Sequence, residues 1–312
     1  MIEIKDLHKS YGDKHAVRGI SFKVEKGEVL GFLGPNGAGK STTMNIISGY
    51  LSMTSGSVII NGHDILDEPE EAKKCIGYLP ELPPLYLDMT VLEYLTFVCD
   101  LKKVPKDQRK VQLAKILSMV KITDVADRLI GNLSKGYKQR VGIAQALVGD
   151  PEILILDEPT VGLDPNQILE IRKLISKLAK TKTIIISSHI LSEIQAMCDR
   201  VVIINHGKVA AIDTITDLSA RLTGNSKLLL CFKGAIKDVI NSLRTIPGVS
   251  SISERVTNES GIHEIEIIVD YSAGGDVRAN IFYNMAKNSW PILEFRSLDP
   301  TLEEVFLSIT SA

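Results

Sequence analysis

The sequence predicts an α/β fold with a largely parallel sheet covered by helices, followed by a smaller α+β domain. Two observations predict it. Over most of the chain, apolar segments without alternating polarity are interleaved with segments of helical periodicity. This is the pattern of buried parallel strands and the helices that cover them. After about residue 226 the expected elements follow the order β-α-β-β-α-β, which is typical of a ferredoxin-like fold.

The composition limits the class of protein. The chain has 312 residues, enough for two domains and a large core. Its 36 Lys+Arg nearly balance 38 Asp+Glu, so we expect no bulk electrostatic binding to nucleic acid or to an anionic membrane. The four cysteines are far apart and form no C-x-x-C pair, which argues against disulfides or a zinc site and favours a reducing compartment. The charged N-terminus is not a signal peptide, and no apolar run approaches the roughly 18–20 residues that span a bilayer.

The first domain, residues 1–222, is expected to contain most of the elements. Residues 2–33 have the pattern of short strands joined by turns, with a bend at Lys26-Gly27. Apolar runs of strand length then alternate with segments whose apolar residues recur every three or four positions. The expected strands are 57–62, 75–80, 153–156, 183–188 and 200–205. The expected helices are 91–103, 107–122, 165–180 and 190–198. A hairpin at 206–213 and a short helix through Leu222 close the domain.

A linker at residues 223–226 separates this domain from a second one at 227–312. Its expected strands and helices are 227–232, 235–244, 249–256, 263–270, 276–288 and 292–297. A last helix begins at Asp299-Pro300, because proline is tolerated in a first turn. The apolar residues of this helix, expected to pack in a core, are Leu302, Val305, Phe306 and Ile309. We assign no catalytic residue to the second domain.

The stretch GPNGAGKST, residues 34–42, matches the pattern G-x-x-x-x-G-K-[ST] and stands between an expected strand and a helix. Its glycines let the backbone curl closely and direct its N–H groups at phosphates. Lys40 supplies a positive charge for the β- and γ-phosphates, and the Ser41 hydroxyl is a candidate ligand for Mg²⁺. An ordinary glycine-rich turn fits this context poorly. The predicted nucleotide-binding residues are Gly34, Pro35, Asn36, Gly37, Ala38, Gly39, Lys40, Ser41 and Thr42.

Two carboxylates directly follow a second apolar strand, in the stretch ILILDEPTVGLD at residues 153–164. Asp157 suits the Walker B role, in which a carboxylate holds magnesium. Glu158 is then the candidate general base that orients and deprotonates the attacking water. The alternative is an ordinary acidic turn at a strand end, but an unpaired carboxylate beside a buried apolar strand would be costly.

The stretch NLSKGYKQRVGIAQAL, residues 132–147, joins a polar, glycine-containing turn to a helix with apolar periodicity. Ser134 stands where a helix begins, Gly136 leaves bare backbone, and basic residues crowd the same turn. Taken alone, this pattern predicts an N-cap with a solvated first turn.

Along the chain the phosphate loop comes first, LSKGY second and LDEPTVGLD third, and this order resembles the nucleotide-binding subunit of an ABC transporter over about residues 1–220. That resemblance implies a P-loop ATPase domain with a parallel-sheet core, an antiparallel β subdomain and a helical subdomain. LSKGY resembles the family signature LSGGQ, which caps the ATP held by the phosphate loop of another subunit. Ser134 and the Gly136 amide are therefore implied to contact the γ-phosphate in trans, at a positively polarised helix N-terminus. Lys135 and Tyr137 depart from the consensus, and Lys135 adds positive charge.

Three single positions carry over from the same resemblance. Tyr11 resembles the aromatic residue that stacks on adenine; the alternative is a half-buried core tyrosine. His189, after the strand TIIISS, resembles the switch histidine that reaches the γ-phosphate, although a lone histidine is usually structural. Asp164 resembles the aspartate of the family's D-loop, which lies between the two subunits, and Asp164-Pro165 is also a good helix start.

One departure from the family lies at Glu81, where a glutamine normally faces magnesium and the attacking water. A carboxylate can still bind the metal or its water, but without Mg²⁺ it would repel the triphosphate. The stretch around it, residues 76–95, resembles ATPases of the gliding-motility, drug-export and polysaccharide-export branch, where glutamate occurs at this position. The tail, residues 297–310, resembles the extra C-terminal domain of that branch. The loop with Pro83-Pro84 and the helices after it are implied to contact the membrane subunit.

The resemblance implies an ATP-hydrolysing subunit of an exporter, with ATP and Mg²⁺ as cofactors. Its partners would be a second copy or a paired ATPase subunit, together with integral-membrane permease subunits, and no nucleic acid. Such a subunit is cytoplasmic and attaches to the cytoplasmic face of the cell membrane through the permease. ATP drives the permease only through its differential affinity for closed and open dimers.

Two other classes stay open from the sequence. A soluble ABC ATPase without transport, such as a translation factor or repair ATPase, normally carries two cassettes or a long coiled coil, and this chain has neither pattern. A nucleotide-binding regulator that barely hydrolyses ATP would explain Glu81 and LSKGY as degenerate sites. Four intact residues argue against it: Lys40, Asp157, Glu158 and His189.

Overall fold

The computed structural model describes residues 1–188, 190–214, 217–218, 226–257, 262–269, 277–297 and 302–310. The chain divides into two compact units, one of Met1–Ile215 with Ile309–Ala312 and one of Thr216–Ser308. Most of the predicted linker lies outside the described residues, so the domain boundaries at 222 and 227 stay predictions. Among the helices that are described, none is both long and apolar enough to cross a bilayer.

The first unit begins with a four-stranded antiparallel sheet. In sheet order its strands are β2 (Lys14–Val24), β1 (Ile2–Tyr11), β4 (Ser55–Ile60) and β5 (His63–Asp64). We expected short strands here, but β1 and β2 span 10 and 11 residues. The pairing register shifts between Ile4 and Leu7, and Asp6 has a φ of 44°. These bulges interrupt the alternation of buried and exposed side chains along the strand. The uninterrupted alternation is therefore shorter than the strand itself, and the sequence predicts a shorter strand.

A six-stranded sheet forms the centre of the first unit. Its strands, in sheet order, are β10 (Lys208–Thr214), β9 (Arg200–Asn205), β3 (Val29–Leu33), β8 (Thr183–Ser187), β7 (Ile153–Asp157) and β6 (Ile76–Leu79). All neighbouring pairs are parallel except β10–β9, a hairpin that turns at His206 and Gly207. Every residue of β3, β7 and β8 is buried. The predicted parallel-sheet core is confirmed.

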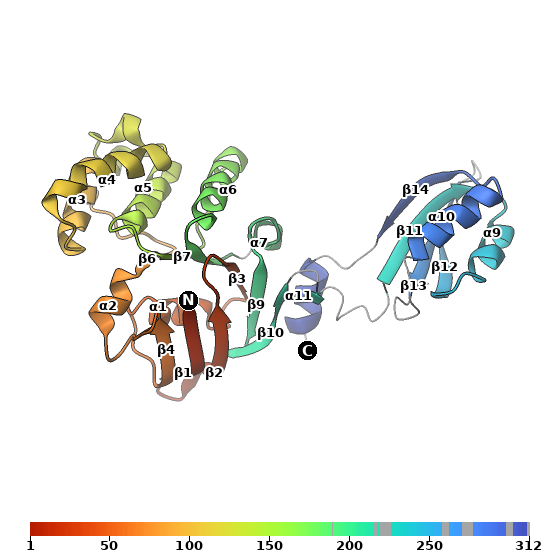
Figure 1. Cartoon of the computed structure of the whole chain (residues 1–312), viewed down its shortest axis with the longest axis horizontal. Coiled ribbons are helices and arrows are strands. Elements are labelled where there is room, and N and C mark those ends of the chain that lie inside the picture. Colours follow the sequence, from red (N-terminus) through yellow and green to blue (C-terminus); the bar gives the residue numbers. More distant parts are fainter. Residues whose placement is uncertain are drawn as a thin grey trace. The chain divides into compact units, whose positions relative to one another are not determined.

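Helices follow the strands of this sheet. They are α1 (Lys40–Ile47), α2 (Pro69–Lys74), α3 (Val91–Leu101), α4 (Lys106–Met119), α5 (Lys135–Leu147), α6 (Pro165–Ala179) and α7 (Leu191–Met197), with 3₁₀ turns at Thr123–Val125 and Ile130–Asn132. The short α2 was not expected; acidic residues in its first turn and lysines in its last turn complement the helix dipole. In Figure 1, α3, α4 and α5 lie together, and each packs on the other two. They form the helical subdomain that the resemblance implied.

One hydrophobic core joins the antiparallel sheet to the central sheet. Its buried residues come from both, including Phe22 of β2, Phe32 of β3 and Ile155 of β7. The rings of Phe22 and Phe32 lie 5.7 Å apart. This packing fixes the end of β3, from which the glycine-rich loop leaves.

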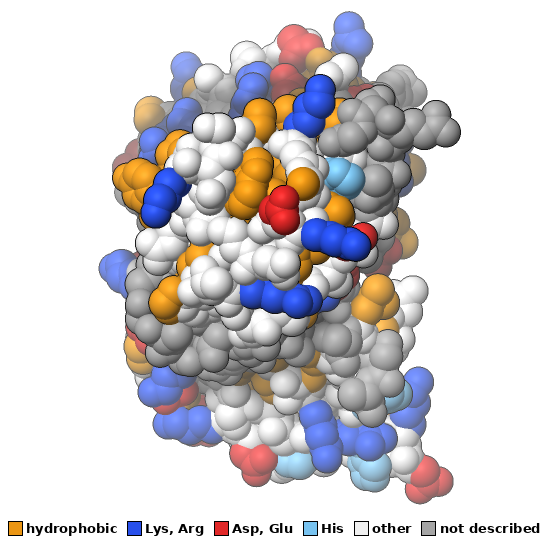
Figure 2. All heavy atoms as spheres, turned by 90° about the vertical axis from the view of Figure 1, so that its right-hand side faces the viewer, with side chains coloured by type: hydrophobic (Ala, Val, Ile, Leu, Met, Phe, Trp, Pro, Cys, Tyr) orange, Lys and Arg blue, Asp and Glu red, His pale blue; other side chains and the backbone are white. Residues whose placement is uncertain are grey.

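The second unit has the predicted ferredoxin-like order. Its elements are β11 (Ser226–Lys233), α9 (Ile236–Leu243), β12 (Val249–Thr257), β13 (Ile262–Val269), α10 (Val277–Lys287) and β14 (Ile292–Ser297). The sheet order is β12-β13-β11-β14, and all pairs are antiparallel. Both helices contribute to one core, with Val239, Leu243, Ile281 and Met285 buried against the sheet. Figure 2 shows hydrophobic side chains lying among lysines and arginines on one face of the molecule.

The last helix, α11 (Leu302–Thr310), forms where it was predicted, although its predicted start at Asp299-Pro300 lies outside the described residues. Phe306 and Ile309 of its apolar stripe are half-buried, and the other two side chains of that stripe are not described. Most of the predicted short helix through Leu222 likewise lies outside the described residues. Asp217 and Leu218 are described, and both are helical.

Candidate nucleotide-binding site

The glycine-rich loop connects the buried β3 to α1, as the motif predicts. Gly39 is the N-cap of α1 with a φ of 105°, and a Cβ atom there would lie 2.6 Å from the carbonyl oxygen of Ala16. No side chain that the structure describes caps this helix, so its first-turn N–H groups remain for a ligand. Lys40 Nζ donates to the carbonyl oxygens of Gly34 and Pro35, at 2.7 and 3.2 Å. The ammonium group is thus held within the curve of the loop.

A cavity of about 480 Å³ lies over this loop. Its lining residues are Tyr11, Lys14, Ala16, Asn36, Gly37, Gly39, Lys40, Ser41 and Thr42. Tyr11 is 50% exposed, with Lys9 Nζ 5.1 Å from the centroid of its ring, so it is not a core tyrosine. The structure therefore brings the predicted stacking residue and the predicted phosphate loop to one cavity.

Asp157 ends β7 beside Ser187, which ends the neighbouring strand β8. Both side chains are buried. Ser187 Oγ donates to Asp157 Oδ1 and accepts from the Glu158 N–H at 3.0 Å. Burial raises the pKa of Asp157; the hydrogen bond from Ser187 opposes this shift, and the negative charges of Glu158 and Glu81 add to it. Ser187 thereby stabilises a carboxylate that burial disfavours.

Glu158 follows with an unusual backbone conformation. Its φ is 49°, in the left-handed region, and Pro159 comes next. A non-glycine residue in such a conformation costs about 1–3 kcal/mol and is enriched at functional sites. The strained turn redirects the chain at the strand end, directly after Asp157.

Lys40 and three carboxylates share one electrostatic environment. Burial lowers the pKa of Lys40, while Glu158, Asp157 and Glu81 oppose that shift. The three predicted metal ligands, Ser41, Asp157 and Glu81, are among the residues that line a second cavity of about 670 Å³. Within the described residues, no three His, Cys, Asp or Glu side chains converge to form an all-protein metal site. A hydroxyl and one or two carboxylates suit Mg²⁺, which takes few protein ligands when it also binds substrate phosphates.

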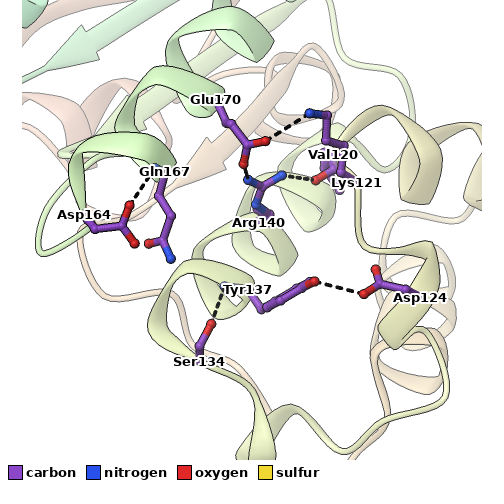
Figure 3. Close-up of polar contacts among 9 residues, drawn as sticks. All are labelled: Val120, Lys121, Asp124, Ser134, Tyr137, Arg140, Asp164, Gln167 and Glu170. Atoms are coloured by element: carbon purple, nitrogen blue, oxygen red, sulfur yellow. Dashed lines mark hydrogen bonds and ion pairs between the residues drawn. The ribbon is translucent and has the colours of Figure 1, made fainter.

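The signature turn begins α5 as predicted. Ser134 is the N-cap and accepts from the Tyr137 N–H at 3.4 Å, and Tyr137 Oη donates to Asp124 Oδ2 at 2.9 Å. Asp164 is the N-cap of α6 and accepts from the Gln167 N–H at 2.9 Å. Figure 3 shows these two helix starts next to each other. Ser134, Gly136 and Asp164 line neither of the two cavities described above.

The signature turn and the loop before α6 pack against each other. A Cβ atom on Gly136 would lie 2.5 Å from Gln167 Oε1, and a Cβ atom on Gly162 would overlap Lys135 Nζ. Each glycine thus makes room for a side chain of the other segment. Lys135, which replaces a consensus glycine, lies on the backbone of the loop that holds Asp164.

A polar cluster ties α5 to α6 further along (Figure 3). The buried Arg140 forms an ion pair with Glu170, and its Nη1 donates to the Val120 carbonyl oxygen at 3.1 Å. Lys121 Nζ lies 3.1 Å from Glu170 Oε1. These contacts hold the signature helix and α6 together.

Three polar residues next to the site were missed from the sequence. They are Ser187, Thr160 and Glu193. Two features of the sequence could have indicated them: a serine ends the apolar run TIIIS, and a glutamate stands in the apolar stripe of α7. His189, the predicted switch residue, lies outside the described residues.

A glycine-rich loop between a central parallel strand and a helix, with a buried aspartate at the end of a nearby strand, defines a P-loop nucleotide-binding core. The family model described as ABC transporter matches residues 17–161. The linearmycin resistance ATP-binding protein of Bacillus subtilis is 36% identical over 99% of this chain and 98% of its own length. The chain belongs to the ABC transporter family as an ATP-binding subunit, an ATPase coupled to transport.

Two further matches are an export protein and a solved dimeric cassette. The Nod factor export ATP-binding protein I of Burkholderia orbicola is 38% identical over 67% of this chain and 69% of its own length. A solved dimeric ATP-binding cassette, in a post-hydrolysis state bound to ADP and Pi, is 27% identical and has a TM-score of 0.63. That structure covers 69% of this chain, and the match takes in 99% of the solved chain.

Proposed function

We propose that two ATPase subunits, either two copies of this chain or a pair, close around two ATP molecules, and that hydrolysis reopens them to power separate permease subunits. The observation that carries this proposal is the division of the site. The phosphate loop, Asp157 and Glu81 line cavities of one chain, whereas Ser134 and Gly136 line neither. A second subunit would bring its signature turn to the open side of the phosphate loop. The dimeric cassette with ADP and Pi supports this arrangement.

The residues have distinct roles in the proposed reaction. Tyr11 stacks on adenine, and the loop from Gly34 to Thr42 binds the phosphates through its N–H groups. Lys40, already held by two loop carbonyls, turns its charge to the β- and γ-phosphates. Glu158 orients and deprotonates the attacking water, and His189 contacts the γ-phosphate.

Mg²⁺ would be held by Ser41 and Asp157, with Glu81 binding the ion or its water. When bound, the ion neutralises charge that develops on the transferred phosphoryl group. The Ser187 hydrogen bond favours the ionised form of Asp157 and orients its carboxylate for this task. Glu81 without the ion would repel the triphosphate, so its position makes nucleotide binding depend on magnesium.

The signature turn acts on the nucleotide of the other subunit. The Ser134 hydroxyl and the Gly136 N–H stand at the start of α5, where the helix dipole favours a phosphate oxygen. Asp164 lies in the neighbouring loop and contacts the other subunit. Lys135 packs against Gly162, and Gln167 packs against Gly136. Because of these contacts, the signature turn and the loop with Asp164 meet the partner subunit as a single rigid surface.

Export is the direction that we infer, since the relatives above include a resistance protein and an export protein. The chain would act at the cytoplasmic face of the cell membrane, bound to its permeases through the Pro83-Pro84 loop and the helices after it. We assign the second domain, at 227–312, to an accessory role in dimer support, regulation or partner selection.

Magnesium-dependent ATP turnover by the full chain tests this proposal. We expect turnover that needs Mg²⁺ and is lost in Glu158→Gln, while that variant still binds ATP. The isosteric amide keeps the size of the side chain and removes the base. A chain that binds ATP without hydrolysing it, or a Glu158→Gln variant as active as wild type, would count against the proposal.

A further inference from the structure

A buried carboxylate with no role in the reaction above lies on α7. Glu193 is 1% exposed. Its Oε2 accepts from Thr160 Oγ1 at 2.5 Å and from Ser188 Oγ at 3.2 Å. Its Oε1 lies 3.8 Å from Arg172 Nη2, and this oxygen has no hydrogen-bond partner within the described residues. A buried charge held by two neutral hydroxyls and one distant cation is an expensive arrangement for packing alone.

The three partners of Glu193 belong to three segments of the candidate site. Thr160 comes two residues after Glu158, in the strained turn that leaves β7. Ser188 directly precedes His189, and its Oγ also accepts from the Ile190 N–H at 3.0 Å. Arg172 lies on α6, the helix that Asp164 caps. One carboxylate oxygen therefore joins the segment of the candidate base to the segment of the candidate switch residue.

We propose that Glu193 is a positioning residue for ATP hydrolysis, which holds the turn after Glu158 and Ser188, the residue before His189, in a single arrangement. This inference rests on the proposed function, because it concerns the residues that act on the attacking water and the γ-phosphate. The two segments are loops that follow neighbouring strands, and no backbone hydrogen bond between them is seen in the described part of the chain. Ser187 joins the two strand ends through Asp157 and the Glu158 N–H. Further along, the Thr160 and Ser188 hydroxyls are joined through Glu193.

The test compares three variants of the full chain with one matched control. Glu193→Leu removes both acceptors and keeps the side-chain volume close to that of glutamate. Thr160→Val removes the donor, and Thr160→Ser keeps it. The control is Thr183→Val, which removes another buried threonine hydroxyl, one that accepts from the Gly27 N–H at 2.9 Å at the start of β8. Turnover number, KM for ATP and the urea midpoint are measured for each variant.

We expect kcat to fall by about 10- to 100-fold in Glu193→Leu and Thr160→Val, as misplacing catalytic groups by about 1 Å does. The urea midpoint of Glu193→Leu should fall, because the Thr160 and Ser188 hydroxyls lose their acceptor and Arg172 loses its partner. Turnover is therefore measured without urea and expressed per folded molecule. KM should change less than about threefold, since the nucleotide contacts remain. Thr160→Ser should restore kcat to within about threefold of wild type, and the control should lose no more than that.

A merely structural role predicts different results. A loss of kcat that the unfolded fraction alone accounts for would overturn the proposal, as would full activity in Glu193→Leu or a Thr160→Ser variant as impaired as Thr160→Val. If Glu193→Leu does not fold, the two Thr160 variants decide. A wild-type chain without turnover would contradict the proposed function itself, whereas active wild type with inactive Glu158→Gln and active Thr160→Val would reject the Glu193 role alone.

Discussion

Ser187 donates a hydrogen bond to Asp157 at the ends of two adjacent parallel strands, where these two residues are in register. The same hydroxyl accepts from the Glu158 N–H. One buried oxygen thus uses its hydrogen for the candidate metal ligand and a lone pair for the backbone of the candidate base. The positions of both carboxylates depend on it.

Ser187→Ala should raise the Mg²⁺ concentration needed for half-maximal turnover. Without the hydroxyl, Asp157 loses a donor and the Glu158 N–H loses an acceptor, which costs about 1–3 kcal/mol per unsatisfied buried group. Urea unfolding and magnesium titrations of turnover measure the two effects. Ser242→Ala, which removes a hydroxyl bonded to Asn284 Oδ1 at 2.9 Å in the second unit, is the control and should leave the magnesium dependence unchanged. An unchanged magnesium requirement in Ser187→Ala would refute the assigned contact.

Gly39→Ala should destabilise the protein by about 2–5 kcal/mol, since it combines a strained conformation with a steric clash. At a φ of 105° the new Cβ would meet the Ala16 carbonyl oxygen at 2.6 Å. Gly12→Ala is the matched control, because Gly12 has a φ of 57° and nothing within 4 Å of the added atom. We expect that control to cost about 1 kcal/mol. Equal urea midpoints for the two variants would contradict the close approach of Gly39 to β2.

Glu170→Gln should change stability in a pH-dependent way. Hydrogen bonds from Lys121 and Arg140 lower the pKa of Glu170 below its ordinary value of 4.5. A carboxylate whose pKa is lower in the folded state stabilises that state above its unfolded pKa. The contribution is lost as the pH falls through the lowered value. The difference in unfolding free energy between wild type and Glu170→Gln should therefore be constant above about pH 5.5 and shrink below pH 4.5.

Urea titrations at pH 7, 5.5 and 3.5 measure this difference, and it should also decrease at high salt, because Glu170 is partly exposed to solvent. Lys121→Met keeps the Arg140 ion pair and serves as the partial control. A difference that grows on acidification would have the wrong sign for this ion pair.

Cys198 should resist alkylation in the native protein. Burial, with the charge of Asp199, raises the pKa of its thiol to about 12. At pH 8 only about one molecule in 10,000 carries the reactive thiolate. Cys75 and Cys198 are both half-buried. Brief iodoacetamide treatment followed by peptide mass spectrometry should nevertheless modify Cys75 before Cys198 in the folded protein, and both should react at similar rates in urea. The Cys198 sulfur lies next to Gly31 of β3. Faster modification of Cys198 than of Cys75 in the folded protein would contradict this packing.

The parts of the site that are local in sequence could be predicted. The loop from Gly34 to Thr42 contains its own strand-turn-helix context, and the caps Ser134 and Asp164 lie three residues from the N–H groups they accept from. Patterns of this length are visible in a sequence because the same few residues form the contact.

The contacts made by Ser187 and Glu193 could not be predicted in this way. Asp157 and Ser187 are 30 residues apart, and Thr160 and Glu193 are 33 apart. Their meeting depends on which strands become neighbours and in which register, and apolar periodicity specifies neither. The bulges of β1 were missed for a related reason, since a bulge shifts the alternation by which a strand is recognised.

The mass in solution of Glu158→Gln, with and without ATP and Mg²⁺, tests the central claim most directly, beside the double variant Glu158→Gln/Ser134→Arg. We expect ATP to convert the single variant from monomer to dimer, because nucleotide that is not hydrolysed keeps the two subunits closed. The double variant should bind ATP and stay monomeric, because arginine blocks the turn that caps the nucleotide of the partner. If the single variant binds ATP and stays monomeric, two copies of this chain do not form the closed dimer. If the double variant dimerises equally well, the signature turn does not act in trans and the two-site account is wrong.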